Sequence, residues 1–156
     1  MNSCLIQDFY NLRINLKMMD LPYKVDPSTK RDLVLVLCSL LEGHEVDYAT
    51  LHKASEIFQA NLERKYGATL GYKFNDISIY KPWDDEFQRD LERWDAVSKL
   101  ITIHDSDDYI HLEIPKRAKF LLNVLILKNL ENEFDKFREF IEEIRNKVES
   151  YKNLRV

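Results

Sequence analysis

The sequence of 156 residues has few residues that interrupt regular structure, with only three glycines and four prolines. Long irregular loops are therefore expected to be rare. The two cysteines, Cys4 and Cys38, form no CxxC motif and are too few to hold a fold of this size together. Reduced thiols in a cytoplasmic protein are the simplest expectation.

Long apolar segments and a targeting signal are also missing. The longest apolar run, residues 33–41 with one serine inside it, is about half of the roughly 20 residues that a membrane span needs. The N-terminus lacks a basic region followed by an apolar stretch, which argues against a secretory signal. No membrane partner is expected.

An excess of positive charge is absent as well, because the formal net charge is -4. An acidic total counts against strong DNA binding, whose affinity comes largely from neutralised phosphates. A local basic face still acts within a Debye length of about 8–10 Å. The 45% share of hydrophobic residues is enough for a real core and predicts a folded, mostly helical domain.

Two helices are predicted in the first half of the chain. The first covers residues 27–42, begins at the N-cap Asp26 with proline in its first position, and ends at Gly43. Its middle is apolar on every side, which predicts a place at the centre of the domain. The second begins at the N-cap Asp47 and is closed by Gly67.

Three further segments are less regular. Residues 5–16 have apolar residues at helical spacing, and alternation over residues 12–18 leaves a strand open as the alternative. Residues 72–80 are rich in β-formers and are predicted to be extended. A third helix is predicted over residues 84–99, with a buried stripe formed by Phe87, Leu91, Trp94 and Val97.

Two alternating runs, residues 100–104 and 109–114, are joined by a short polar turn and predict a β-hairpin. If His104 pairs with Tyr109, both strands agree on one inner face. That face would carry Ile101, Ile103, Ile110 and Leu112, leaving Thr102, His104, Tyr109 and His111 outside.

No glycine or proline follows Pro115, so a single helix over residues 115–153 is predicted. At 1.5 Å per residue it would be roughly 58 Å long, too long to pack entirely on one small domain. Its heptad pattern predicts a dimer interface made of Leu130, Phe134, Phe137, Ile141, Ile144, Val148 and Tyr151. Because aromatic residues are wide for a two-stranded seam, packing of the near half on the domain itself remains an alternative.

The segments FQRDLERW, LITI, YIHL and PKRAKF, all within residues 84–120, resemble the closing part of winged-helix domains. In that family a helix with a DLxxL motif leads into LIxI, a turn, YIxLT and a helix opened by KG or KR. Residues 72–83 are similar to an extended element of some uncharacterised archaeal winged-helix proteins. The resemblance implies a mainly α fold with a small β-hairpin (α+β), as a winged-helix domain over residues 1–114 and a long dimerisation helix over 115–156.

The resemblance also implies a homodimeric DNA-binding regulator of transcription, with residues 84–99 as recognition helix and 105–108 as wing tip. Arginine and glutamine are the side chains that read bases, and lysine and arginine contact phosphates. The candidate DNA-binding residues are Gln88, Arg89, Arg93, Lys116, Arg117 and Lys119. The sequence departs from this pattern, because the helix is mixed in charge and the wing tip has three carboxylates. A protein–protein interaction module that does not bind DNA is therefore the alternative function.

Signatures of catalysis or metal binding are lacking. The sequence has no phosphate-binding glycine loop, HExxH or GxSxG motif. His104 and His111 are predicted to lie diagonally on the outer face of the hairpin, but no third and fourth ligand stands at a recognised spacing. We expect no catalytic residue, no metal and no cofactor.

Overall fold

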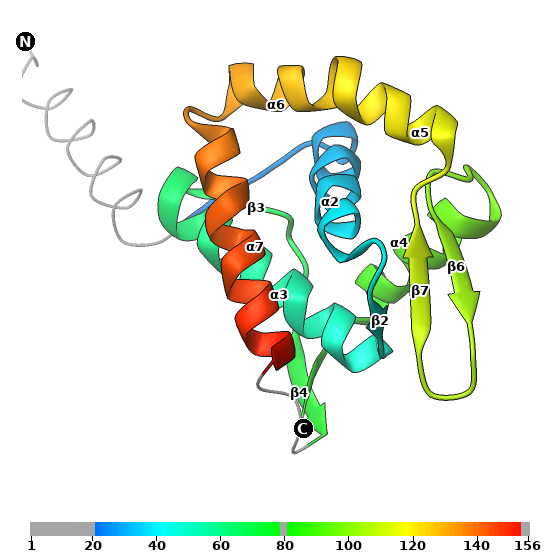
Figure 1. Cartoon of the computed structure of the whole chain (residues 1–156). Coiled ribbons are helices and arrows are strands. Elements are labelled where there is room, and N and C mark those ends of the chain that lie inside the picture. The colour runs from blue at the N-terminus through cyan, green and yellow to red at the C-terminus, as the bar shows by residue number, and fades with distance from the viewer. Residues whose placement is uncertain (1–20, 79–80, 154–156) are drawn as a thin grey trace, which may run out of the picture.

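The computed structural model describes residues 21–78 and 81–153, and it combines helices with small β-sheets (Figure 1). The chain is mixed α and β, as predicted. The helix or strand predicted over residues 5–18 lies outside the described residues.

Helix α2 (Pro27–Leu41) lies at the centre of the molecule. The Asp26 carboxylate accepts a hydrogen bond from the Thr29 backbone N–H at 2.8 Å, which satisfies one of the free donors of the first turn. Six consecutive residues from Leu33 to Cys38 are buried, so every side of the helix contacts other parts of the chain. The predicted start, end and central position of this helix are confirmed.

Helix α3 (Tyr48–Tyr66) follows the two-residue strand β2 (Glu45–Val46). Asp47 caps it by accepting from the Thr50 backbone N–H, and Gly67 ends it in the left-handed conformation at φ 64°. The predicted helix is confirmed, whereas strand β2 was not predicted.

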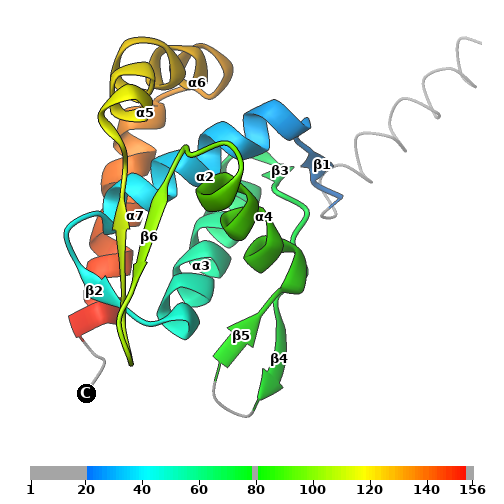
Figure 2. The ribbon, with the colours of Figure 1, turned by 90° about the vertical axis from the view of Figure 1, so that its right-hand side faces the viewer.

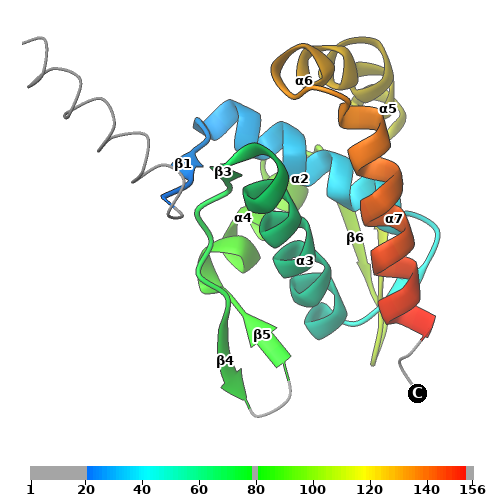
Figure 3. The ribbon, with the colours of Figure 1, turned by 90° about the vertical axis from the view of Figure 1, so that its left-hand side faces the viewer.

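The connection from α3 to α4 is longer and more structured than a simple turn. Strand β3 (Ala68–Thr69) pairs in parallel with β1 (Tyr23–Lys24), and β4 (Asn75–Ser78) pairs antiparallel with β5 (Lys81–Trp83). Residues 75–78 of the segment predicted to be extended thus form a paired strand, whereas residues 79–80 lie outside the described residues. Figures 2 and 3 show β4 and β5 projecting from one end of the molecule.

Helix α4 (Asp85–Ala96) begins at the N-cap Asp84, and Phe87 and Leu91 of its predicted stripe are buried. Trp94 is only partly buried, and Val97 is 76% exposed, so the prediction for Val97 is wrong. The helix ends before Val97, and the following turn contains Lys99 at φ 54°. Val97 is the C-cap residue, and its N–H still donates to the Arg93 carbonyl at 2.8 Å, but its side chain lies beyond the part of α4 that the core covers.

Strands β6 (Thr102–Asp105) and β7 (Ile110–Glu113) form the predicted hairpin with a register shifted by two residues. His104 pairs with His111 instead of Tyr109, because the Ser106 N–H donates to the Tyr109 carbonyl and tightens the turn. A shift of two residues keeps each side chain on its face. The predicted inner residues are accordingly buried, or partly buried in the case of Ile103.

Strand β2 adds to the hairpin and completes a three-stranded antiparallel sheet in the order β2-β7-β6. Apart from β1 and the strands β3 to β5, the chain runs helix α2, strand β2, helices α3 and α4, and strands β6 and β7, with β7 in the middle of the sheet. Figure 2 shows the sheet beside α4 and below α5.

The prediction of a single long C-terminal helix is wrong. The chain forms α5 (Lys116–Leu121), a π-helical segment η1 (Leu122–Ile126), α6 (Leu127–Glu133) and, after a break, α7 (Phe137–Asn153). The break lies at Phe134, whose backbone is extended, and at Lys136, whose φ is 56°. Figures 1 and 3 show α7 turning back from the end of α6 and running along the body of the molecule.

Aromatic packing explains the break. The Phe134 and Tyr66 rings lie 5.1 Å apart, and the Phe140 and Phe58 rings lie 5.7 Å apart. Burying rings of this size stabilises the folded chain by several kcal/mol, which outweighs the roughly 1–2 kcal/mol of one left-handed residue. The residues predicted for the dimer seam are buried within their own chain, namely Leu130, Phe134, Phe137, Ile141, Ile144 and Val148. The side chain of Tyr151 lies outside the described part.

Candidate functional site

The predicted base-reading residues of α4 are only partly available. Arg89 and Arg93 are exposed, and the Arg93 guanidinium lies 4.0 Å from the Asp90 carboxylate. Gln88 is held on both sides, because its carbonyl lies 2.9 Å from His52 Nε2 and its amide donates to Glu92 at 3.2 Å. The glutamine would have to break these bonds before it could read a base.

The predicted phosphate-binding residues lie on α5. Lys116 and Arg117 are exposed in its first turn, whereas Lys119 forms an ion pair with Glu42 at 2.9 Å. Figure 2 shows α5 above the sheet and α4 beside strand β6. The two basic groups therefore belong to different parts of the surface.

Negative charge dominates the two elements that were predicted to contact DNA, helix α4 and the β6–β7 hairpin. Helix α4 has five carboxylates against two guanidinium groups, which leaves a net charge of -3. Residues 101–114, which form the hairpin, contain four carboxylates and no lysine or arginine. Each carboxylate would be repelled by phosphate, and recognition helices of DNA-binding proteins gain their affinity from the opposite charge.

A buried histidine joins α4 to α3 and β5. His52 accepts the Asp84 backbone N–H on Nδ1 at 3.2 Å, so the proton resides on Nε2, which donates to Gln88. Its ring stacks on Trp83 with centroids 3.8 Å apart and meets the edge of Phe87. Burial lowers the pKa of His52, which keeps the ring neutral. The arrangement orients α4 and leaves neither ring nitrogen for a reaction.

A second buried network holds the other side of α4. The Tyr72 hydroxyl donates to Asp90 at 2.6 Å, and Lys30 contacts both Asp90 and Glu86 at 3.2 and 3.0 Å. Burial and the Asp90 carboxylate raise the pKa of Tyr72 well above its usual range. Since all these groups are satisfied by one another, the network is structural.

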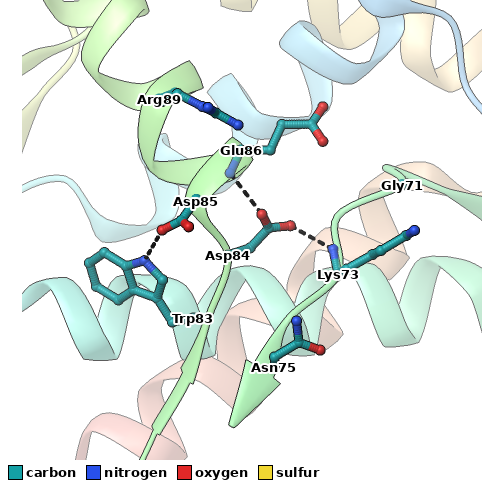
Figure 4. Close-up of a pocket in the computed structure, with 8 residues that line it drawn as sticks. All are labelled: Gly71, Lys73, Asn75, Trp83, Asp84, Asp85, Glu86 and Arg89. Atoms are coloured by element: carbon teal, nitrogen blue, oxygen red, sulfur yellow. Dashed lines mark hydrogen bonds between the residues drawn. The ribbon is translucent and has the colours of Figure 1, made fainter. Parts of the chain in front are cut away.

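A shallow hollow of about 300 Å³ lies between the start of α4 and the loop before β4 (Figure 4). Asp84 accepts from the backbone N–H groups of Glu86 and Lys73, and Asp85 accepts from the Trp83 indole. The lining is completed by Gly71, Asn75 and Arg89. Three carboxylates against two cations make this hollow unsuited to an anion, and the carboxylates are already used within the chain.

The histidines of the hairpin lie directly opposite each other, so the predicted diagonal arrangement is wrong. His104 contacts Glu113 at 2.7 Å and His111 contacts Glu45 at 3.3 Å, beside an open cavity of about 450 Å³. Within the described residues, no group of three or more histidine, cysteine, aspartate or glutamate side chains is arranged to hold a metal ion.

The sequence did not predict an exposed apolar surface that lies on α5 and η1. We call it the apolar row, and its members are Phe120, Leu121, Val124 and Leu125, which are 65%, 39%, 56% and 51% exposed. Ala118, Leu122 and Ile126 on the other side of the same segment are buried. The segment is thus anchored by one apolar side and presents a second one to solvent, along the edge of the molecule in Figure 1.

The spacing of these residues explains the shape of the row, although their exposure could not be predicted from the sequence. The buried residues recur every fourth position from Ala118 to Leu130, so the residues two and three positions later form parallel columns on the outside. Phe120 and Val124 form one column, and Leu121 and Leu125 form the other. The π-helical turn supports this spacing of four, because it has more residues per turn than an α-helix.

Comparison with protein-family models, curated proteins and solved structures finds no match to this chain. Among the described helices, none is both long and apolar enough to cross a membrane.

Proposed function

We propose that this chain is a winged-helix-like protein-interaction module that binds a partner protein through the apolar row. The observation that carries the proposal is the exposure of four large apolar side chains on one side of a helix whose other side is part of the core. Large contiguous exposed apolar patches on soluble proteins often mark interaction sites.

The order and pairing of the elements support the winged-helix part of the proposal. Apart from β1 and the strands β3 to β5, the order is helix α2, strand β2, helices α3 and α4, and the β6–β7 hairpin, and β7 pairs with β2. The β4–β5 hairpin is an addition between helices α3 and α4. A fold does not define a function, so the surface must decide what is bound.

The surface favours protein over DNA. Helix α4 and the β6–β7 hairpin would be the DNA-contacting elements of a winged helix, and both are negatively charged. A homodimeric DNA-binding regulator remains the second candidate, because Arg89, Lys116 and Arg117 are exposed and basic. Fluorescence polarisation with labelled mixed-sequence duplex separates the two candidates: we expect no binding at low ionic strength, and salt-dependent binding would favour the DNA-binding regulator.

Site-specific photo-crosslinking in the source cells tests the protein interaction. A photoreactive amino acid at Phe120 is expected to form a discrete protein adduct, because that side chain lies in the proposed interface. The matched control is Val97, which is also apolar and is 76% exposed but lies after α4. Adducts of the same kind from both positions, or from neither, would refute the proposed interaction.

A further inference from the structure

We infer that the apolar row binds an amphipathic helix of a partner protein, with an apolar stripe bounded by carboxylates at both ends. This inference rests on the proposed function and names the class of partner.

The shape of the row fits a helix. Its two columns run in parallel along the segment from α5 into η1, and the buried residues Ala118, Leu122 and Ile126 hold that segment against the core. Side chains in parallel columns form ridges, and helices pack by placing the ridges of one in the grooves of the other. A partner helix can therefore lie along the row without a rearrangement of the chain.

Positive charge stands at both ends of the row. Lys116 and Arg117 precede it by one turn, and Lys128 follows it by one turn. All three are exposed, and within the described residues none of them forms an ion pair, in contrast to Lys119, which is paired with Glu42. Uncompensated cations at the rim of an apolar surface favour carboxylates at the matching positions of a partner.

A second copy of the chain fits the row less well. If two rows overlap in antiparallel register, so that Phe120 faces Leu125, then Arg117 of one copy faces Lys128 of the other. Like charges opposite each other are unfavourable in an interface. The charges therefore act against self-association through this surface.

An anionic membrane also fits less well. Each lysine or arginine near such a surface contributes about 1 kcal/mol, and three are present at the row. The chain as a whole has a net charge of -4, and acidic residues follow the row at Glu133 and Asp135. A protein partner can have carboxylates opposite the cations and none opposite the acidic residues, whereas a membrane presents negative charge to the whole face.

Two synthetic helical peptides test the inference on the full-length chain. They share one leucine stripe, and one has glutamates and the other lysines at both ends of the stripe. We expect the glutamate peptide to bind at least about tenfold more tightly in fluorescence polarisation at low salt, because its carboxylates meet the three cations. The preference should decrease as salt is added.

Paired variants assign the binding to this surface. Phe120→Ser is expected to abolish binding of the glutamate peptide, whereas the matched Val97→Ser leaves it unchanged. The double variant Lys116→Glu and Arg117→Glu is expected to reverse the preference between the peptides, and Lys99→Glu, an exposed charge elsewhere, is its control. Circular dichroism confirms that each variant is folded.

Several outcomes would overturn the inference. Equal binding of the two peptides, or binding of neither, excludes the charged-end helix as the partner. Sedimentation that shows a dimer lost in Phe120→Ser would assign the row to a second copy, and Phe120-dependent flotation with phosphatidylserine vesicles would assign it to a membrane. The crosslink from Phe120 decides independently whether any protein binds there, so the two proposals can fail separately.

Discussion

Two parts of the C-terminal region, α7 and the α5–η1 segment, are both helical and contain many apolar residues, but their roles are opposite. Both contain phenylalanine and branched apolar residues. In α7 the apolar residues Phe137, Phe140 and Ile144 are buried against the same chain. In α5–η1 the apolar row faces solvent although the segment is anchored. Apolar surface in α7 therefore stabilises the fold, whereas the apolar row remains available for binding.

The break between α6 and α7 produces this difference. It allows α7 to return along α3, where the Phe140 ring lies 5.7 Å from Phe58 and 5.4 Å from Tyr66. Without the break, the last helix would extend away from the domain and would expose its apolar side.

Truncation in α7 should cost the most stability. Phe140→Ala removes a ring that is fully buried, and we expect the free energy of unfolding to fall by about 3–5 kcal/mol. Urea denaturation followed by circular dichroism measures this loss. A loss below about 1 kcal/mol, the range typical of exposed positions, would mean that α7 does not pack on the core as described.

The histidine that orients α4 should make stability depend on pH. Burial lowers the pKa of His52 in the folded state, whereas in the unfolded chain it titrates near 6.5. Below that pH the unfolded state takes up a proton that the folded state resists, so the free energy of unfolding should decrease as the pH falls from about 7.5 toward 5. His52→Phe keeps an aromatic ring beside Trp83 and cannot titrate.

The control measurement compares how steeply the free energy of unfolding depends on pH in the unsubstituted protein and in His52→Phe. We expect the free energy of unfolding of His52→Phe to be lower at neutral pH, because the bonds to Gln88 and to the Asp84 backbone are lost, but to depend less on pH over that window. Identical slopes would show that another group causes the pH dependence. A steeper slope in the variant would contradict the assigned neutral state of His52.

The helices could be predicted from the sequence because their signals are local. Asp26, Asp47 and Asp84 each cap the helix that they were expected to begin. In the hairpin, alternation determined which face each residue occupies, whereas the register depended on the turn around Ser106, which alternation does not encode. Local sequence patterns therefore predict helices, strands and their buried faces better than they predict the register in which strands pair.

The fold of the C-terminal region could not be predicted in this way. A heptad pattern identifies an apolar side of a helix but does not say whether another chain or the same chain covers it. The break at Phe134 and Lys136 has no glycine or proline to mark it, because tertiary packing of aromatic rings outweighs a modest local cost. The apolar row was missed for the same reason, since exposure depends on what the rest of the chain covers.

The left-handed backbone of Lys136 at the break should lower the free energy of unfolding by a small, measurable amount. Lys136 has φ 56°, a conformation that glycine adopts without strain, so Lys136→Gly should raise the free energy of unfolding by up to about 1 kcal/mol. Lys128→Gly, within α6, is the control and should lower it by about 1 kcal/mol. Thermal unfolding with opposite shifts in Tm would support the break, and a loss of stability in both variants would place Lys136 in a helix.

Truncation in the apolar row should have the smallest effect on stability and the largest on binding. Phe120 is 65% exposed, so Phe120→Ala removes few contacts of the folded chain and should change the free energy of unfolding by less than about 0.5 kcal/mol. The same substitution at Phe140 costs several kcal/mol, although both remove one phenylalanine from a C-terminal helix. Urea denaturation of the two variants side by side makes the comparison direct. If Phe120→Ala were as destabilising as Phe140→Ala, the ring at position 120 would be part of the core and the apolar row would have no free surface to offer a partner.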